Sequence, residues 1–167
     1  MYDKLTKDDI KKMEEEIEYR KLVIRKKVLE EVKETRAQGD LSENFEYHAA
    51  KKAKNQNDSR IRYLERMIKT AIIIEDDTED NQAGVNKKIT VHFLDDDSVE
   101  SYIIVTSVRG NSLEGYICLD SPIAKALQGH KEGDVVTVQL ENGAGYDLEI
   151  LKVEPIDKDL EIELRSF

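Results

Sequence analysis

The chain has 167 residues, of which 36 are acidic and 26 are basic, giving a formal net charge of −10 at pH 7. This charge argues against a protein held on bare DNA or RNA by a general basic surface, because neutralising phosphates takes clustered lysines and arginines. The single cysteine, Cys118, excludes an intramolecular disulfide framework and a zinc cluster built on cysteines. No apolar run approaches a membrane span and the first residues form no signal peptide, so we expect a cytoplasmic protein with no membrane partner.

The charge is unevenly distributed along the chain. Residues 1–75 carry 18 basic and 16 acidic residues, whereas residues 76–167 carry 8 and 20. The first part contains no proline and one glycine, Gly39, while the other seven glycines and both prolines lie in the second part. This contrast predicts two units, with long helices first and turn-linked strands later.

Two long amphipathic helices are predicted in the first unit. Apolar residues recur three, four or seven apart within residues 7–37, which indicates a helix of about 31 residues. A second stripe of the same kind runs through residues 45–71. The short break between them contains Gly39, a helix-ending glycine, and Ser42, the expected N-cap of the second helix.

A short loop between two such helices predicts an antiparallel hairpin, here a slender two-helix coiled coil over residues 1–75. Its apolar seam is imperfect, because Arg20 and Lys27 fall where a strict heptad would have apolar residues. The tip of the hairpin is expected at about residues 39–47.

The second unit is predicted to be a small antiparallel sheet domain over residues 85–156, which makes the fold class α+β. Residues 76–84 are acidic and poor in apolar residues and are predicted to be a linker, and residues 157–167 form a charged tail. Ser121 before Pro122 predicts one short helix with Ser121 as its N-cap. The strand-like segments are residues 89–94, 102–105, 116–119, 135–140 and 146–153.

The hairpin tip holds the most informative cluster, three acids within seven residues: Asp40, Glu43 and Glu46. Helix capping and dipole interactions explain acids in a first turn without any further function. Two carboxylates are too few for a dedicated Mg²⁺ cage, but they suit sharing an ion that another site already half-holds.

The helix behind the tip is basic, with seven bases against two acids over residues 47–70. A solvated helix face accounts for such a stretch equally well. The residues of this basic arm that we single out are Lys51, Lys52, Lys54, Arg60 and Arg62.

The segment 39–54, GDLSENFEYHAAKKAK, resembles the tip motif of the bacterial Gre transcript-cleavage factors, the GreA/GreB family, and is closer to the GreA type. The resemblance continues in SPIAKAL at 121–127, in GDVV at 133–136 and in YDLEILKV at 146–153. It covers nearly the whole chain in the right order. It implies an N-terminal coiled coil and a C-terminal domain similar to FKBP prolyl isomerases, without that activity.

The resemblance also implies a function. The C-terminal domain would dock on RNA polymerase, and the coiled coil would enter the secondary channel. Asp40 and Glu43 match the family's essential tip acids, which help to hold a second Mg²⁺ shared with the polymerase, so that the polymerase cuts backtracked nascent RNA near its 3′ end. The chain alone would be a monomer with neither enzymatic activity nor a bound metal. The implied tip-support residues are Asn44, Phe45, Glu46 and Tyr47, and the implied docking residues are Ser121, Pro122, Ile123 and Ala124.

Some features depart from the family pattern. Phe45 stands where the family commonly has alanine, the linker is more acidic than usual, and the tail 157–167 extends past the usual end. An alternative function is therefore a secondary-channel regulator that inhibits or tunes the polymerase without stimulating cleavage. An FKBP-like isomerase is a third hypothesis, and the absence of tryptophan, with only three phenylalanines, argues against the aromatic pocket it would need.

Overall fold

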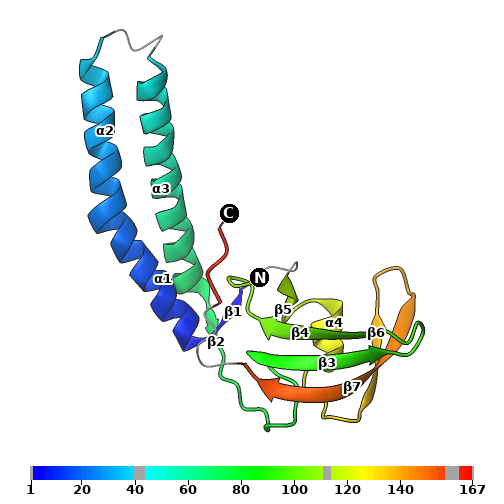
Figure 1. Ribbon diagram of the computed structural model, residues 1–167. Helices are drawn as coiled ribbons and strands as arrows, with labels where there is room; N and C mark the ends of the chain where they lie inside the picture. The colour runs from blue at the N-terminus through cyan, green and yellow to red at the C-terminus, as the bar shows by residue number, and fades with distance from the viewer. Residues whose placement is uncertain (1, 40–43, 111–113, 157–161, 167) are drawn as a thin grey trace. The chain divides into compact units, whose positions relative to one another are not determined.

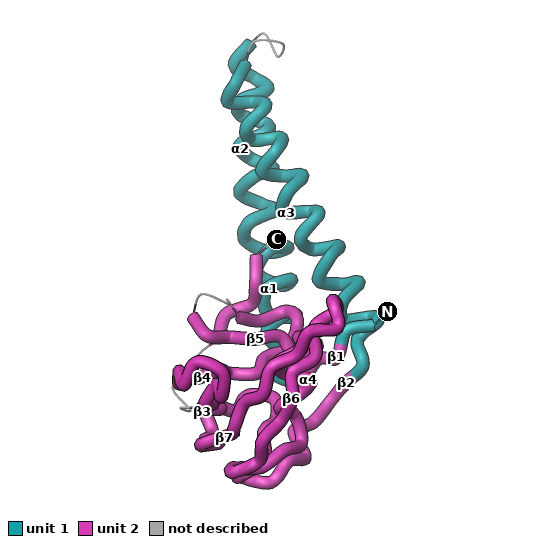
Figure 2. Tube along the Cα trace, turned by 90° about the vertical axis from the view of Figure 1, so that its right-hand side faces the viewer, with its two compact units in different colours: residues 1–3, 7–72, 167 teal, residues 4–6, 73–166 magenta. Residues whose placement is uncertain are grey.

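The structure is a computed structural model that describes residues 2–39, 44–110, 114–156 and 162–166 (Figure 1). The chain forms two compact units. The first unit consists mainly of residues 7–72, and the second of residues 4–6 and 73–166 (Figure 2). The short strands β1 (Lys4–Leu5) and β2 (Ile72–Ile73) pair with each other. The helical first part and the sheet-containing second part confirm the predicted α+β class.

The first unit is a helical hairpin, as predicted. The helices are α1 (Lys7–Tyr19), α2 (Arg25–Ala37) and α3 (Phe45–Thr70), and a π-helical turn, Arg20–Ile24, joins α1 to α2. Figure 1 shows α3 running alongside α2. The buried apolar side chains of the seam are Met13, Val28, Tyr47, Ala50, Ile61 and Leu64. Because this apolar seam is narrow, the helices are stabilised by pairing and not by their own propensity. None of the helices in the described ranges is long and apolar enough to cross a membrane.

The second unit is built on a five-stranded sheet. Its strands are β3 (Lys87–Phe93), β4 (Val99–Val105), β5 (Tyr116–Cys118), β6 (Val135–Gln139) and β7 (Gly145–Pro155), in the spatial order β5-β4-β3-β7-β6. The central strand β3 alternates between buried Ile89 and Val91 and exposed Lys88, which is the period-2 pattern of a sheet with one covered face.

The pairing of β5 with β4 differs from the prediction of a purely antiparallel sheet. Tyr116 lies opposite Ile103 and Cys118 opposite Val105, so these two strands are parallel and the sheet is mixed. Gly110 and Gly115 adopt positive φ values of 94° and 82°, which only glycine reaches without strain. The register places the start of β5 beside the middle of β4.

The one short helix of this unit, α4 (Pro122–Leu127), forms where it was predicted. Ser121 Oγ accepts a hydrogen bond from the Ala124 N–H at 3.3 Å, and Pro122 occupies the first turn. Ala124 and Leu127 are fully buried in the core of the domain. The strand residues that join them in this core include Ile89, Val91, Ile104, Val138, Leu148 and Ile150.

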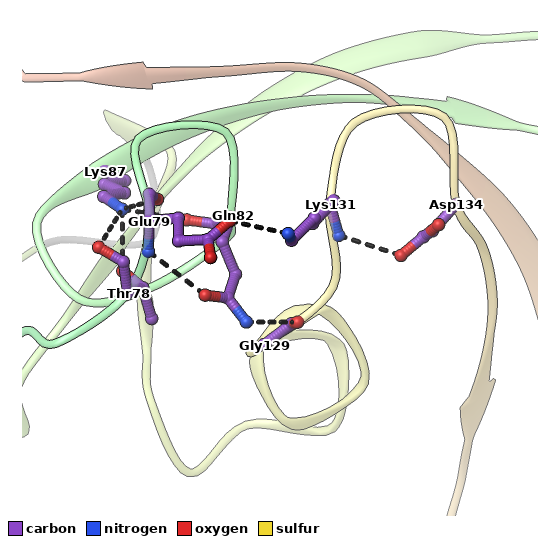
Figure 3. Close-up of polar contacts among 7 residues, drawn as sticks. All are labelled: Thr78, Glu79, Gln82, Lys87, Gly129, Lys131 and Asp134. Carbon is purple, nitrogen blue, oxygen red and sulfur yellow. Dashed lines mark hydrogen bonds and ion pairs between the residues drawn. The ribbon is translucent and has the colours of Figure 1, made fainter.

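The segment predicted as a linker, 76–84, is held by a buried lysine of β3. Lys87 is 7% exposed, and its Nζ donates to Thr78 Oγ1 at 2.6 Å and to the main-chain oxygens of Glu79 at 2.6 Å and Gln82 at 2.9 Å (Figure 3). Three oxygens around one ammonium satisfy all of its donors.

A second set of contacts ties the same segment to the turn after α4. The side-chain nitrogen of Gln82 donates to the Gly129 oxygen at 2.6 Å, and Lys131 Nζ lies 2.6 Å from Glu79 Oε2 (Figure 3). The Ala83 side chain is fully buried. The acidic segment is therefore tied to the rest of the second unit by hydrogen bonds and an ion pair, and its last two residues, Ala83 and Gly84, are buried.

Candidate functional site

The acidic loop predicted to be functional joins α2 to α3. Asp40 and Glu43 lie outside the described residues, and so does Ser42. On the α2 side the helix ends at Ala37, and Gly39 has a φ of 125°, as expected for a glycine that follows a helix.

On the other side of the loop, Asn44 is the N-cap of α3, the role that was predicted for Ser42. Its Oδ1 accepts a hydrogen bond from the Tyr47 N–H at 3.0 Å. Its side-chain nitrogen donates to the main-chain oxygen of Thr35 in α2 at 2.7 Å. One side chain thus satisfies an unpaired donor at the start of α3 and a carbonyl near the end of α2. This Asn44 clamp holds together the two ends of the acidic loop.

The predicted tip-support residues divide by orientation. Tyr47 is buried, and the Arg36 guanidinium carbon lies 5.8 Å from its ring centroid. A hydrogen bond from Arg36 lowers the pKa of the Tyr47 hydroxyl below its ordinary value. Glu46 is exposed, and Phe45 is 86% exposed. Asn44 and Tyr47 therefore make contacts with α2, while Phe45 and Glu46 are exposed.

The residues of the predicted basic arm do not form one surface. Lys51, Lys52 and Arg62 are exposed, whereas Lys54 pairs with Asp58 at 3.3 Å. A shallow hollow of about 440 Å³ on α3 is lined by His48, Lys51, Lys52, Asn55, Gln56 and Ser59. No carboxylate lines this hollow, and the polar ends of its lining side chains are those of two lysines, a histidine, two amides and a serine.

Arg60 lies instead in the interface between the helices. It is 6% exposed, and its Nε donates to Glu16 Oε2 at 2.8 Å. Arg20 Nε donates to the same oxygen at 3.0 Å, and Arg20 Nη1 donates to Asn57 Oδ1 at 3.0 Å. Burial raises the pKa of Glu16, but the hydrogen bonds and charges of Arg60 and Arg20 outweigh it and lower the pKa.

This interhelical polar network was not predicted from the sequence. The signal that points to it is Arg20, a charged residue in the apolar seam. A charge taken out of water requires a partner, so an arginine at a seam position implies an acceptor on the facing helix.

The four predicted docking residues differ in accessibility. Pro122 is exposed, Ser121 and Ile123 are half-buried, and Ala124 is fully buried. Ile123 packs against the core of the domain, and Ser121 caps α4. Of the four, Pro122 is therefore the accessible residue, and Ala124 packs in the core of the domain.

No metal-binding cluster of three His, Cys, Asp or Glu side chains occurs among the described residues. The carboxylates expected to share an ion are those of Asp40 and Glu43. Carboxylate oxygens are suitable ligands for Mg²⁺, which is bound by one or two of them together with phosphates and waters.

Comparison with known proteins matches both units. Residues 4–73 match the family described as transcription elongation factor, N-terminal, and residues 78–155 match the family described as transcription elongation factor, GreA/GreB, C-term. The chain is 47% identical over 140 residues to transcription elongation factor GreA of Geobacillus kaustophilus, which covers 83% of this chain and 89% of the relative. It is 46% identical over 139 residues to GreA of Bacillus subtilis, which covers 83% and 88%. A solved structure, GreA factor homolog 1 (Gfh1) of Thermus thermophilus, aligns over 92% of this chain and 99% of its own length, at 22% identity and a TM-score of 0.43.

Proposed function

Because the chain belongs to the GreA/GreB family of transcription elongation factors, we propose that it binds bacterial RNA polymerase and stimulates the polymerase's own cleavage of backtracked RNA. The hairpin enters the secondary channel, and the chain alone catalyses no reaction. The observation that carries the proposal is the Asn44 clamp, in which Asn44 bonds to Thr35 before the acidic segment 40–43 and to Tyr47 after it.

The dimensions of the hairpin support this function. The 26 residues of α3 span about 39 Å at 1.5 Å per residue, enough to reach a site deep inside a large partner. The buried apolar side chains of the hairpin lie in the seam, and most of its exposed residues are polar, with Leu22 and Phe45 among the apolar exceptions. A narrow polar rod of this kind fits a water-filled channel.

The chemistry assigned to the tip follows from its carboxylates. Asp40 and Glu43 would hold the second Mg²⁺ of the polymerase site, an ion that polarises the scissile phosphodiester and lowers the pKa of a bound water. The two carboxylates also orient the attacking water, while the Asn44 clamp keeps the loop from spreading. Without the ion the same carboxylates would repel the RNA phosphates.

The remaining parts of the proposal concern docking and cellular context. The C-terminal domain docks on the polymerase through the surface around Pro122, which is exposed at the start of α4. The protein acts as a monomer in the cytoplasm, and its contacts to nucleic acid are made to the nascent RNA 3′ end inside the complex.

The test is RNA cleavage in purified, backtracked polymerase complexes. The double variant Asp40→Asn, Glu43→Gln replaces both carboxylates by amides of similar size and so removes both charges. We expect it to cleave at the unstimulated rate while still competing with labelled wild-type protein for the polymerase. We also expect wild-type protein to lower the Mg²⁺ concentration needed for half-maximal cleavage, and the variant to leave that concentration unchanged.

A matched control removes two charges elsewhere on the hairpin. Glu14 and Glu18 are exposed on α1, so Glu14→Gln, Glu18→Gln changes the net charge equally without touching the tip. This control should cleave as wild type does. Stimulated cleavage by the tip variant at the wild-type rate would overturn the metal-sharing function.

The second candidate function is a channel-bound regulator that does not stimulate cleavage. The exposed ring of Phe45 beside the acidic loop favours it, because a large side chain there occupies space near the reacting RNA. Such a regulator would slow nucleotide addition and leave the cleavage rate unchanged, so the same complexes distinguish the two functions.

A further inference from the structure

Phe45 is unusually exposed for an aromatic residue. At 86% it has the highest exposed fraction among the large apolar side chains of the described residues. It is the first residue of α3, directly after the Asn44 clamp, so its backbone is held in place while its ring is surrounded by solvent. An apolar ring held in this way gains nothing from the fold and is available to a partner.

The same side of α3 carries cations. Residues three, four and seven apart lie on one helix face, which places His48 and Lys52 in line with Phe45. His48 and Lys52 line the hollow on α3, together with Lys51 and without any carboxylate. An exposed aromatic ring followed by cationic and amide side chains is the arrangement that binds single-stranded nucleic acid, where bases stack and phosphates meet positive charge.

We propose that Phe45 is a stacking residue for the unpaired base at the 3′ end of backtracked RNA, with Lys51 and Lys52 facing the adjoining phosphates. This inference rests on the proposed function, because it places the tip of the hairpin next to that RNA end. An apolar pocket of the polymerase is the competing partner for the ring, but such a pocket does not account for Lys52 on the same face or for Lys51 beside it in the hollow.

Stacking has a consequence for specificity. Every base has a π face, so Phe45 accepts all four, but purines offer a larger stacking surface than pyrimidines. We therefore expect stimulated cleavage to be faster on complexes with a purine at the RNA 3′ end, by about threefold or more. Hydrogen-bond readout of the base is not required.

The experiment uses 2-aminopurine, an adenine analogue whose fluorescence falls on stacking, as the 3′-terminal base of RNA in a backtracked polymerase complex. The protein added is the full chain carrying Asp40→Asn and Glu43→Gln, so that the RNA stays intact. We expect the 2-aminopurine emission to fall when the added protein retains Phe45 and when it carries Phe45→Trp. The emission should stay unchanged when the added protein carries Phe45→Leu. Leucine is the matched control because it keeps an apolar side chain and removes only the aromatic ring.

A second readout uses the chain with both tip acids intact. Phe45→Leu should abolish the purine preference and slow cleavage of purine-ended complexes by about fivefold or more, the lower bound for losing one aromatic–base stack. Its affinity for polymerase without RNA should stay at the wild-type value.

Two results would overturn the inference. The first is equal quenching by the protein that retains Phe45 and by the one that carries Phe45→Leu. The second is an equal loss of polymerase affinity by Phe45→Leu with and without RNA, which would assign the ring to a protein contact. Failure of the proposed function can be distinguished from failure of this inference. If the proposed function fails, cleavage stays at the basal rate with wild-type protein, whether or not the 2-aminopurine emission is quenched.

Discussion

The side-chain amide of Asn57 donates a hydrogen bond to the main-chain oxygen of Arg20, at 3.2 Å, across the helical hairpin. Arg20 Nη1 donates in return to Asn57 Oδ1 at 3.0 Å. The Arg20 oxygen also accepts from the Arg25 N–H, five residues later, which is the hydrogen bond of a π-helical turn. The turn contains one extra residue, and it lies at the same level of the hairpin as the Arg20–Asn57 pair. Together they define one register between the helices.

Asn57→Ala should destabilise the hairpin, because it leaves the half-buried Arg20 guanidinium without this acceptor. We expect the free energy of unfolding to fall by about 1–3 kcal/mol, measured by urea denaturation followed by far-UV circular dichroism. The matched control is Asn55→Ala, at an exposed position of the same helix, which should change stability by less than about 0.5 kcal/mol. Equal effects of the two substitutions would show that the Asn57 pair contributes nothing specific.

The stability of the hairpin should depend on pH through Glu16. Its pKa in the folded protein lies below the ordinary value of 4.5, so the carboxylate contributes stability that is fully present above that value. This stability is lost as the pH falls through the lowered folded pKa. Urea denaturation at neutral pH and at about pH 3 measures how much the free energy of unfolding falls on acidification. This fall should be smaller for Glu16→Gln than for wild type.

The same variant should already be less stable at neutral pH, because Arg60, at 6% exposure, loses its charged partner. Glu14→Gln is the control, since Glu14 is exposed on the same helix and should leave the pH profile unchanged. If the stability of Glu16→Gln depended on pH as that of wild type does, the role of the Glu16–Arg60 pair would be contradicted.

Lys87→Met should destabilise the C-terminal domain. Methionine fills a similar volume but leaves the oxygens of Thr78, Glu79 and Gln82 without their donor. We expect a loss of about 2–4 kcal/mol in thermal or urea unfolding, because the three acceptors lose the same donor together. The neighbouring Lys88 is exposed on the opposite face of β3, so Lys88→Met should be close to wild type. An unchanged unfolding transition for Lys87→Met would exclude a structural role for the ammonium.

Asn44 should affect cleavage through the position of the acidic loop. Asn44→Ala removes both the cap on the Tyr47 N–H and the bond to the Thr35 oxygen, and should cost about 1 kcal/mol of stability. Asn44→Asp keeps a good capping acceptor but lacks the amide donor, so it should restore thermal stability without restoring stimulated cleavage.

The readouts for the Asn44 pair are the melting temperature and the cleavage rate at saturating protein, with polymerase affinity as the control. Wild-type cleavage by Asn44→Asp would show that the link to Thr35 is not needed.

Much of the fold follows from local patterns. The hairpin, the helix-ending Gly39 and the Ser121 cap with Pro122 at the start of α4 were predicted from spacing and from residue types that act on their own neighbours. The N-cap of α3 was misplaced by two residues, at Ser42 in place of Asn44. Both residue types cap helices well, and what distinguishes Asn44 is a bond to Thr35 nine residues away in sequence, across the loop.

The sequence by itself determined the two units, their secondary structure and the motif that assigns the family, because helix periodicity, strand alternation and turn chemistry are properties of short segments. Only the tertiary structure decided which charges are available at the surface. Arg60 and Lys87 look like other bases in the sequence, but both are buried, whereas Lys51, Lys52 and Phe45 remain exposed. Arg60 is paired with Glu16 on the facing helix, 44 residues away, and Lys87 binds oxygens of a segment five to nine residues before it. The physical reason is that burial and pairing depend on how segments fold against one another, and these contacts exist only once the segments have packed together.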